Sequence, residues 1–176
     1  MKLLLYCTKA KPNIVKGLDN KFYISNAFKE EGIDAYKLNG KIVAECDFEV
    51  EKLFIKYGEG WQTDTIKGTE NIEKLTCVNR EELYQYCKGK GYAIHIKNLH
   101  IFDKPRELYD CLIHPKIEPR YYGCEHLSKA PQNMMYVELD DIRYILISIR
   151  PEWLCKILNG EKTIEVRKKV LKEMIK

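Results

Sequence analysis

The stretch from Tyr144 to Arg167 constrains the fold most, because it predicts one strand–helix–strand unit. Residues 144–150 alternate between two faces as in a strand, and Pro151 fixes a backbone angle suited to the first position of a helix. Apolar residues at helical spacing follow, and Gly160, which adopts a positive φ without steric cost, ends the helix. Period-2 alternation then returns, with Ile164 and Val166 on one face.

The second strand of this unit carries charge opposite its apolar face. Lys162, Glu165 and Arg167 follow the turn, and the first strand adds the hydroxyl of Ser148. If the two strands are neighbours, these polar groups converge. A carboxylate beside Lys and Arg stays ionised and orients their donors, which makes a site for a phosphate, a carboxylate or a base edge. The alternative is a solvated strand face with no ligand.

The same residues carry a resemblance. The strings Ser148-Ile-Arg-Pro and Lys156-Ile-Leu-Asn-Gly-Glu-Lys-Thr-Ile-Glu-Val-Arg167 resemble the opening of ASCH domains, members of the PUA-like superfamily with the signature G-x-K-x-x-E-x-R. The signature matches at Gly160, Lys162, Glu165 and Arg167. The resemblance implies an α+β fold, a small mixed β-barrel with peripheral helices, and a cleft that binds RNA or a modified nucleoside.

The order of the segments departs from that family. Several segments look like the later part of an ASCH domain: the strand Leu3 to Tyr6 with Cys-Thr-Lys after it, Gly-Lys-Ile-Val-Ala-Glu, and Ala-Pro-Gln near the end. The segment that usually opens such a domain comes last in this chain. One explanation is a circularly permuted single domain over 1–176, with 145–168 completing the barrel formed by 1–140. The other is one domain followed by a fragment of a second. A fragment of about 35 residues is too small to form its own hydrophobic core. It would therefore complete the first domain, giving a monomer, or swap into a neighbouring chain, giving a domain-swapped dimer.

Composition sets broad bounds. The fractions of 45% hydrophobic and 32% charged residues are typical of a soluble globular protein, and the net charge of +4 permits an RNA or anion ligand without demanding one. The cysteines are scattered without a C-x-x-C pair, and the start of the chain carries no cleavable signal, so we expect a reduced cytoplasmic protein without a membrane partner. The histidines lack the spacing of metal ligands, and we expect no metal and no cofactor.

The first half of the chain predicts a buried strand over Leu3–Tyr6 and a longer one over 40–53. The longer strand has one apolar face, and Glu45 on its other face is a candidate member of the site. Phe22 and Tyr23 begin a stretch that predicts a short amphipathic helix ending at Gly32. Residues 54–78 are rich in Gly and Thr and predict a loop, in which Trp61 is either a core anchor or a lid.

The second half opens with a capping signal at Asn79 and Glu82, which predicts a helix that ends at Gly89. Alternation over 91–102 predicts a strand, and Asp103-Lys-Pro105 predicts a turn into a short helix through Leu108 and Leu112. Residues 130–137 predict a further strand entered from a proline turn. Asp140-Asp141 predicts a hairpin that leads into the strand–helix–strand unit.

The leading functional hypothesis is a binding module that holds RNA or a nucleoside. Lys162, Lys9 and Arg167 would hold phosphate or base acceptors, and Glu165 would orient Arg167 or accept from a base amino group. The full set of candidate ligand-binding residues is Lys162, Glu165, Arg167, Ser148, Thr8, Lys9, Gln132 and Glu45.

An enzyme is the alternative hypothesis. Some ASCH-like proteins hydrolyse an acyl group from acetylcytidine, and the resemblance implies a Lys, a nucleophilic Thr and a Glu for that reaction. Lys162 matches the Lys, but Glu165 stands where the Thr would be, and a carboxylate cannot replace a Lys-activated hydroxyl in acyl transfer. Other relatives are ribonucleases, and Lys162 and Glu165 are the candidates for acid–base catalysis in that case. An interaction protein without a nucleic-acid ligand is the third hypothesis.

Overall fold

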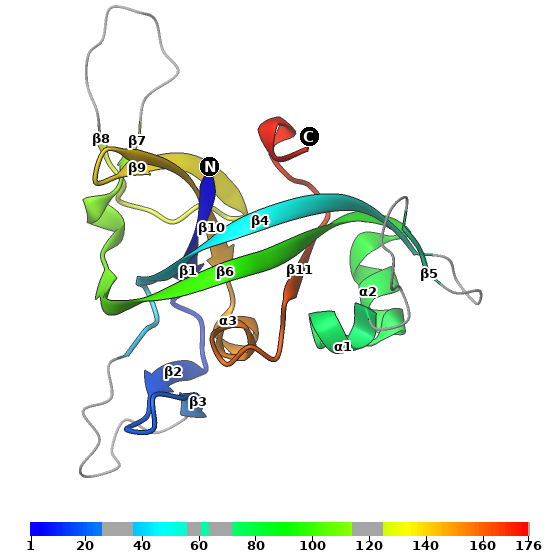
Figure 1. Cartoon of the computed structure of the whole chain (residues 1–176), viewed down its shortest axis with the longest axis horizontal. Helices are drawn as coiled ribbons and strands as arrows, with labels where there is room; N and C mark the ends of the chain where they lie inside the picture. Colours follow the sequence, from blue (N-terminus) through cyan, green and yellow to red (C-terminus); the bar gives the residue numbers. More distant parts are fainter. Residues whose placement is uncertain (26–36, 56–60, 64–71, 114–124, 176) are drawn as a thin grey trace, which may run out of the picture. The chain divides into compact units, whose positions relative to one another are not determined.

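A computed structural model describes residues 1–25, 37–55, 61–63, 72–113 and 125–175 (Figure 1). The chain groups into two compact units. Unit 1 comprises Met1–Asp47 and Leu99–Asn159, and unit 2 comprises Phe48–Asn98 and Gly160–Lys176. Two long neighbouring strands, β4 (Ile42–Ile55) and β6 (Lys90–Arg106), supply residues to both units. A single domain over 1–176 stays a prediction.

Unit 1 is built on a sheet in the order β4-β1-β10-β9-β7-β8. Its central strand β1 pairs in parallel with β10 and antiparallel with β4. β10 turns back on β9 through Asp140 and Asp141, which have φ of 50° and 62°, as a tight hairpin requires. The strands are β1 (Lys2–Cys7), β7 (Leu112–Ile113), β8 (Glu125–His126), β9 (Met134–Leu139) and β10 (Ile142–Ile149), with a 3₁₀ turn η2 (Leu108–Asp110) before β7.

The core of unit 1 lies around β1 and β10. Residues 3–7 and 144–149 are buried on both faces of their strands, because the parallel pair is covered on either side. On one face, Tyr6 of β1 and Leu146 of β10 pack with Ile42 of β4 and Val137 of β9. The helix α3 (Pro151–Leu158) follows β10, begins with Pro at its first position and buries Leu154, Cys155 and Ile157. The predicted strand–helix transition at Pro151 is confirmed.

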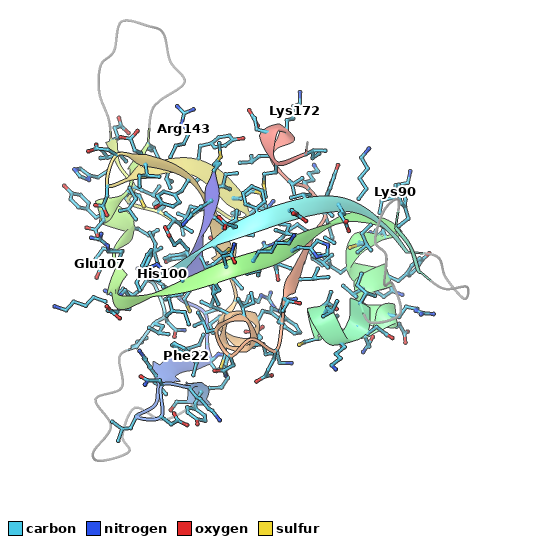
Figure 2. All side chains as sticks on the ribbon, viewed as in Figure 1. Phe22, Lys90, His100, Glu107, Arg143 and Lys172 are labelled. Atoms are coloured by element: carbon cyan, nitrogen blue, oxygen red, sulfur yellow. The ribbon has the colours of Figure 1, made fainter. Side chains whose placement is uncertain are left out.

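A separate two-stranded sheet in unit 1 pairs β2 (Asn13–Lys16) with β3 (Phe22–Ser25). Phe22, labelled in Figure 2, begins β3 and is bonded to Asn159 at the end of α3. The predicted helix from Phe22 is therefore wrong where the structure describes it, since Phe22 and Tyr23 are in a strand. The rest of that predicted helix, up to Gly32, lies outside the described residues.

Unit 2 combines its parts of β4 and β6 with β5 (Trp61–Thr63), β11 (Ile164–Arg167) and two helices, α1 (Ile72–Thr76) and α2 (Arg80–Cys87). β11 pairs antiparallel with β6, and β5 pairs antiparallel with β4. A core of Leu53, Leu83, Ala93, Ile164 and Val166 fills the space between strands and helices. A 3₁₀ turn η3 (Lys172–Met174) follows β11.

Helix α2 begins as its capping signal predicts. The side chain of Asn79 accepts a hydrogen bond from the backbone N–H of Glu82 at 2.9 Å, and Lys88 adopts a left-handed conformation before Gly89. The predicted loop over 54–78 is wrong in part, because α1 and β5 lie within it. The side chain of Trp61 lies outside the described residues. β6 extends to Arg106 without interruption, so the predicted turn at Asp103 is also wrong. A 3₁₀ turn at Leu108–Asp110 stands where a helix through Leu108 was predicted.

The α+β class is confirmed, as a large sheet accompanied by few helices. No closed barrel is found among the described strands of either unit. β10 pairs with β1 and β9, whereas β11 pairs with β6, so the two strands of the strand–helix–strand unit are not partners. None of the described helices has the length and apolar character needed to cross a membrane.

Candidate functional site

The candidate site is a charged cluster at the start of β11 in unit 2. Gly160 ends α3 with φ of 75°, and the chain then enters β11, where Ile164 pairs with His95 and Arg167 with Tyr92. Ile164 and Val166 point into the core of unit 2. Alternation along the strand puts Glu165 and Arg167 on its other face, as the sequence predicts. That face is not solvated at Glu165, whose exposed fraction is 8%.

Glu165 is the centre of the cluster, because each oxygen of its carboxylate faces a different cation. Oε1 lies 2.9 Å from Nε of Arg167, and Oε2 lies 3.4 Å from Nζ of Lys162. The side chains are 3% exposed for Lys162, 10% for Glu165 and 12% for Arg167. One carboxylate therefore lies between two cations in a largely desolvated environment. Such a buried ion pair is stable only if the geometry of its contacts is good.

Lys162 has a further partner that the sequence could not indicate. Its Nζ donates to the backbone carbonyl of Thr76 at 2.7 Å, at the C-terminal end of α1. A cation at this position satisfies a carbonyl that the helix leaves unpaired and complements the negative end of the helix dipole. Two more bonds join the same segments: the Thr163 N–H donates to the carbonyl of Leu75 at 2.9 Å, and the Cys77 thiol contacts the carbonyl of Glu161. Lys162 therefore has a structural role as well as its place in the cluster.

Burial lowers the pKa of Lys162 below its ordinary value, because the apolar surroundings disfavour the charged ammonium. The carboxylate of Glu165 opposes this shift through its charge and its hydrogen bond, while the positive Arg167 adds to it. Glu165 thus favours the charged form of the ammonium, and its other oxygen lies against Nε of Arg167. An arginine held beside a carboxylate offers the N–H donors of its guanidinium, which suits recognition of a base edge or a phosphate.

A second group of predicted residues lies together in unit 1, at the carboxyl end of the parallel pair β1–β10. The Ser148 hydroxyl donates to the carbonyl of Pro131 at 2.6 Å, which places the segment containing Gln132 beside β10. The Thr8 N–H donates to the carbonyl of Ile149 at 3.0 Å, and the buried hydroxyl oxygen of Thr8 has no hydrogen-bond partner in the described part of the chain. Lys9 and Gln132 are exposed.

The stem of Lys9 lies over Gly40, since a Cβ atom at Gly40 would come within 3.2 Å of it. Lys9 is therefore directed toward the turn at Gly40 that precedes β4.

Glu45 does not belong to that group. It is opposite Leu4 on β4, and its carboxylate accepts from Nζ of Lys2 at 2.7 Å and from the Tyr144 hydroxyl at 2.8 Å. Lys2 and Thr8 are at opposite ends of β1, and a strand rises about 3.3 Å per residue, so Glu45 and Thr8 are well separated. The structure assigns Glu45 to an ion pair that holds the start of β1, and Nδ1 of His100 lies 3.8 Å from Oε1 of Glu45.

The predicted residues thus fall into three places: Lys162, Glu165 and Arg167 in unit 2, Thr8, Lys9, Gln132 and Ser148 at one strand end of unit 1, and Glu45 at the other. The hydroxyl of Thr163, next to Lys162 in the chain, is exposed. Sequence reasoning missed Thr76 and Tyr86, which both adjoin the charged cluster. No local pattern could have identified Thr76, because the Lys162 side chain that its carbonyl binds is 86 positions away.

Comparison with protein-family models, curated proteins and solved structures finds no match to this chain.

Proposed function

We propose that this protein is a binding module for single-stranded RNA or a nucleoside, and that it is a PUA-like protein related to ASCH domains. The observation that carries the proposal is the carboxylate of Glu165 held between Lys162 and Arg167. The residues of the G-x-K-x-x-E-x-R signature each have a distinct part in this arrangement. Gly160 supplies the positive φ that redirects the chain, and the other three residues form the charged cluster.

The chemistry of the cluster supports a base as the ligand. A nucleobase edge offers both donors and acceptors, and protein sites read such edges by hydrogen bonds from Arg and to Glu. Glu165 accepts hydrogen bonds, and Arg167 donates them from a guanidinium that the carboxylate orients. A purely anionic ligand would meet repulsion from Glu165. The pairing of an acceptor with a donor therefore favours a base over a simple anion.

The residues after β11 add positive charge. Lys168 and Lys169 follow Arg167 directly and are both exposed. Exposed cations beside a base-reading group are placed to neutralise phosphates, which makes binding depend on salt. In unit 1, Lys9, Thr8, Gln132 and Ser148 stay candidate contacts, and the proposal does not depend on them.

A binding titration tests the proposal. We would titrate short labelled single-stranded RNA and free nucleosides, at low and high salt, into the wild type, Arg167→Ala and Lys97→Ala. Lys97 is the matched control, because it is a cation of the same unit whose ion pair with Glu49 is exposed. We expect Arg167→Ala to weaken binding about tenfold or more and Lys97→Ala to change it little. No binding by the wild type, or equal loss in both variants, would overturn the proposal.

Catalysis is measured in the same experiment. The proteins are incubated with RNA and with acetylcytidine, and the products are separated by chromatography. We expect binding without turnover, because no hydroxyl nucleophile stands at residue 165. Turnover that Lys162→Met abolishes would replace the binding module by the hydrolase or ribonuclease hypothesis.

We also propose that the chain is a circularly permuted single domain, cytoplasmic, and a monomer or a domain-swapped dimer. Pairing of β11 with β6 of the same chain supports completion of the fold within one molecule. A rearranged gene tests this proposal by placing residues 145–168 before residues 1–140. We expect the rearranged chain to fold with the same far-UV spectrum and the same RNA affinity. Light scattering then distinguishes a monomer from a swapped dimer, and a rearranged chain that fails to fold would contradict the permutation.

A further inference from the structure

An aromatic side chain lies beside the charged cluster of unit 2. Tyr86 belongs to α2, whose buried face is formed by Leu83 and Cys87. Tyr86 is turned away from that face and is 43% exposed. The exposed part of this ring is a surface on which a planar ligand could stack.

Two features fix Tyr86 against the residues that follow β11. The Lys168 Nζ lies over the Tyr86 ring, 4.8 Å from its centroid, which is a cation–π contact. The pKa of Tyr86 also responds to the charges of Arg167 and Glu165. Burial raises the pKa of Tyr86, Arg167 opposes that rise and Glu165 adds to it. The tyrosine is therefore an electrostatic neighbour of the Arg167–Glu165 pair.

The close approach of α2 and β11 depends on Gly91. A Cβ atom at Gly91 would lie 2.8 Å from the Cys87 sulfur and 3.2 Å from the Arg167 carbonyl oxygen. The missing side chain lets the last turn of α2 and the end of β11 pack together across β6. Gly91 therefore holds Cys87 and Arg167 close together. Because Tyr86 precedes Cys87 directly in the chain, this packing also sets the position of Tyr86 relative to Arg167.

From this arrangement we infer that Tyr86 is the stacking surface for a nucleobase whose edge is read by Glu165 and Arg167, and that Lys168 contacts the adjoining phosphate. The inference rests on the proposed function and adds the missing aromatic element to it. Recognition of unpaired bases combines an aromatic platform, hydrogen bonding to the base edge and cations for the backbone. Tyr86, the Glu165–Arg167 pair and Lys168 supply these three elements within one unit.

The competing explanation is that Tyr86 only covers the stem of Lys168 on the protein surface. The two explanations predict different behaviour of a bound base. The fluorescence of 2-aminopurine is quenched when this base stacks on an aromatic ring. It is not quenched in this way when the base is held by hydrogen bonds alone. The hydroxyl is also dispensable for stacking, while the ring is essential.

The experiment uses a short single-stranded RNA carrying one 2-aminopurine, and the free 2-aminopurine riboside as a second probe. The variants are Tyr86→Phe, Tyr86→Leu and Lys168→Gln. Tyr109→Leu is the matched control, because Tyr109 is an exposed tyrosine of unit 1. Thermal unfolding of each variant shows whether it is folded.

We expect Tyr86→Phe and Tyr109→Leu to bind and quench like the wild type. Tyr86→Leu should bind both probes about tenfold more weakly and lose the quenching. Lys168→Gln should weaken binding of the RNA but not of the riboside. It should also reduce the slope of RNA affinity against salt concentration by about the amount of one phosphate contact. Loss of binding for the RNA alone in Tyr86→Leu would indicate a backbone contact and would overturn the stacking role.

Failure of this inference is distinguishable from failure of the proposed function. If the wild type binds, Arg167→Ala loses binding and Tyr86→Leu retains both affinity and quenching, the stacking role is overturned and the binding module stands. If the wild type binds neither probe, both are overturned. If Tyr86→Phe binds as weakly as Tyr86→Leu, the hydroxyl and not the ring is the contact, and the stacking role is again overturned.

Discussion

The side chain of Asn159 pairs with the backbone of Phe22 as a neighbouring strand would. The Phe22 N–H donates to Oδ1 of Asn159 at 3.0 Å, and Nδ2 of Asn159 donates to the Phe22 carbonyl at 2.8 Å. The Cys155 thiol contacts the same carbonyl. One side chain at the end of α3 therefore satisfies both backbone groups of the first residue of β3, and holds the small β2–β3 sheet on the helix.

Replacing Asn159 by Ala should loosen the β2–β3 sheet. Both backbone groups of Phe22 would lose the hydrogen bond to Asn159, although the carbonyl keeps its contact with the Cys155 thiol. A typical hydrogen bond contributes about 1 kcal/mol, so we expect a loss of about 1–2 kcal/mol. Hydrogen exchange measures the effect at the right place: the Phe22 amide should lose protection, while the amides of the β9–β10 hairpin keep theirs. Unchanged protection at Phe22 would show that the side-chain pairing contributes nothing.

The same pair of residues explains one error of sequence reasoning. Phe22 and Tyr23 begin a stretch whose pattern up to Gly32 predicts a short amphipathic helix, although Phe and Tyr also favour strands. β3 pairs with β2, where Phe22 lies opposite Lys16, but the Asn159 side chain that anchors Phe22 is 137 positions away. Local patterns cannot report a contact of this range, because tertiary packing overrides weak intrinsic preferences.

Helix α1 was missed for a related reason. It is a helix of 5 residues, too short to be stable by itself, and its last carbonyl is bonded by Lys162 from 86 positions away. Features that depend on local chemistry were predicted correctly: the cap at Asn79, the hairpin at Asp140-Asp141, and the helix between Pro151 and Gly160. Of the candidate site, the sequence indicated Glu165 between two cations but not the burial of Lys162.

Gly160 offers a test of backbone strain without steric interference. Its φ is 75°, and a Cβ atom there would meet nothing within 4 Å. Gly160→Ala should therefore destabilise the protein by about 1 kcal/mol through conformation alone, and Gly160→Asn by less, since Asn tolerates this conformation better. Denaturant unfolding compares the two variants. An Ala variant as stable as the wild type would mean that the turn relaxes at no cost.

Neutralising Glu165 should destabilise the folded protein, because the buried ammonium of Lys162 loses its counter-charge. In Glu165→Gln the ammonium of Lys162 loses its counter-charge while it stays buried, and removing one partner of a buried ion pair destabilises by roughly 3 kcal/mol. The pKa of Lys162 should fall further, because the carboxylate opposes the effect of burial.

Alkaline pH should then partly restore the variant. A lysine whose folded pKa lies below its unfolded value of 10.5 favours folding once it is deprotonated, so stability rises with pH between those two values. This window is wider in Glu165→Gln than in the wild type. Urea unfolding over a pH series measures it, and Lys162→Met/Glu165→Gln, which lacks the buried charge, should lose this component of the pH dependence. A double variant that keeps it would show that another group is responsible.

Glu45 should titrate below its ordinary range. The hydrogen bond from Lys2 is the largest cause of its lowered pKa, and the hydrogen bond from the Tyr144 hydroxyl also lowers it, against the opposing effect of burial. The pKa of Tyr144 is raised to about 12, first by burial and then by its bond to Glu45. Carboxyl resonances followed by NMR over pH should give a Glu45 pKa below 4.5 in the wild type and a higher one in Tyr144→Phe and Lys2→Ala. Because the folded pKa is depressed, the stabilisation is complete above the unfolded pKa and is lost as the pH falls through the folded one. The acid unfolding midpoint of Tyr144→Phe should therefore lie at higher pH than that of the wild type, and coincident midpoints together with an unchanged Glu45 pKa would contradict the assigned hydrogen bond.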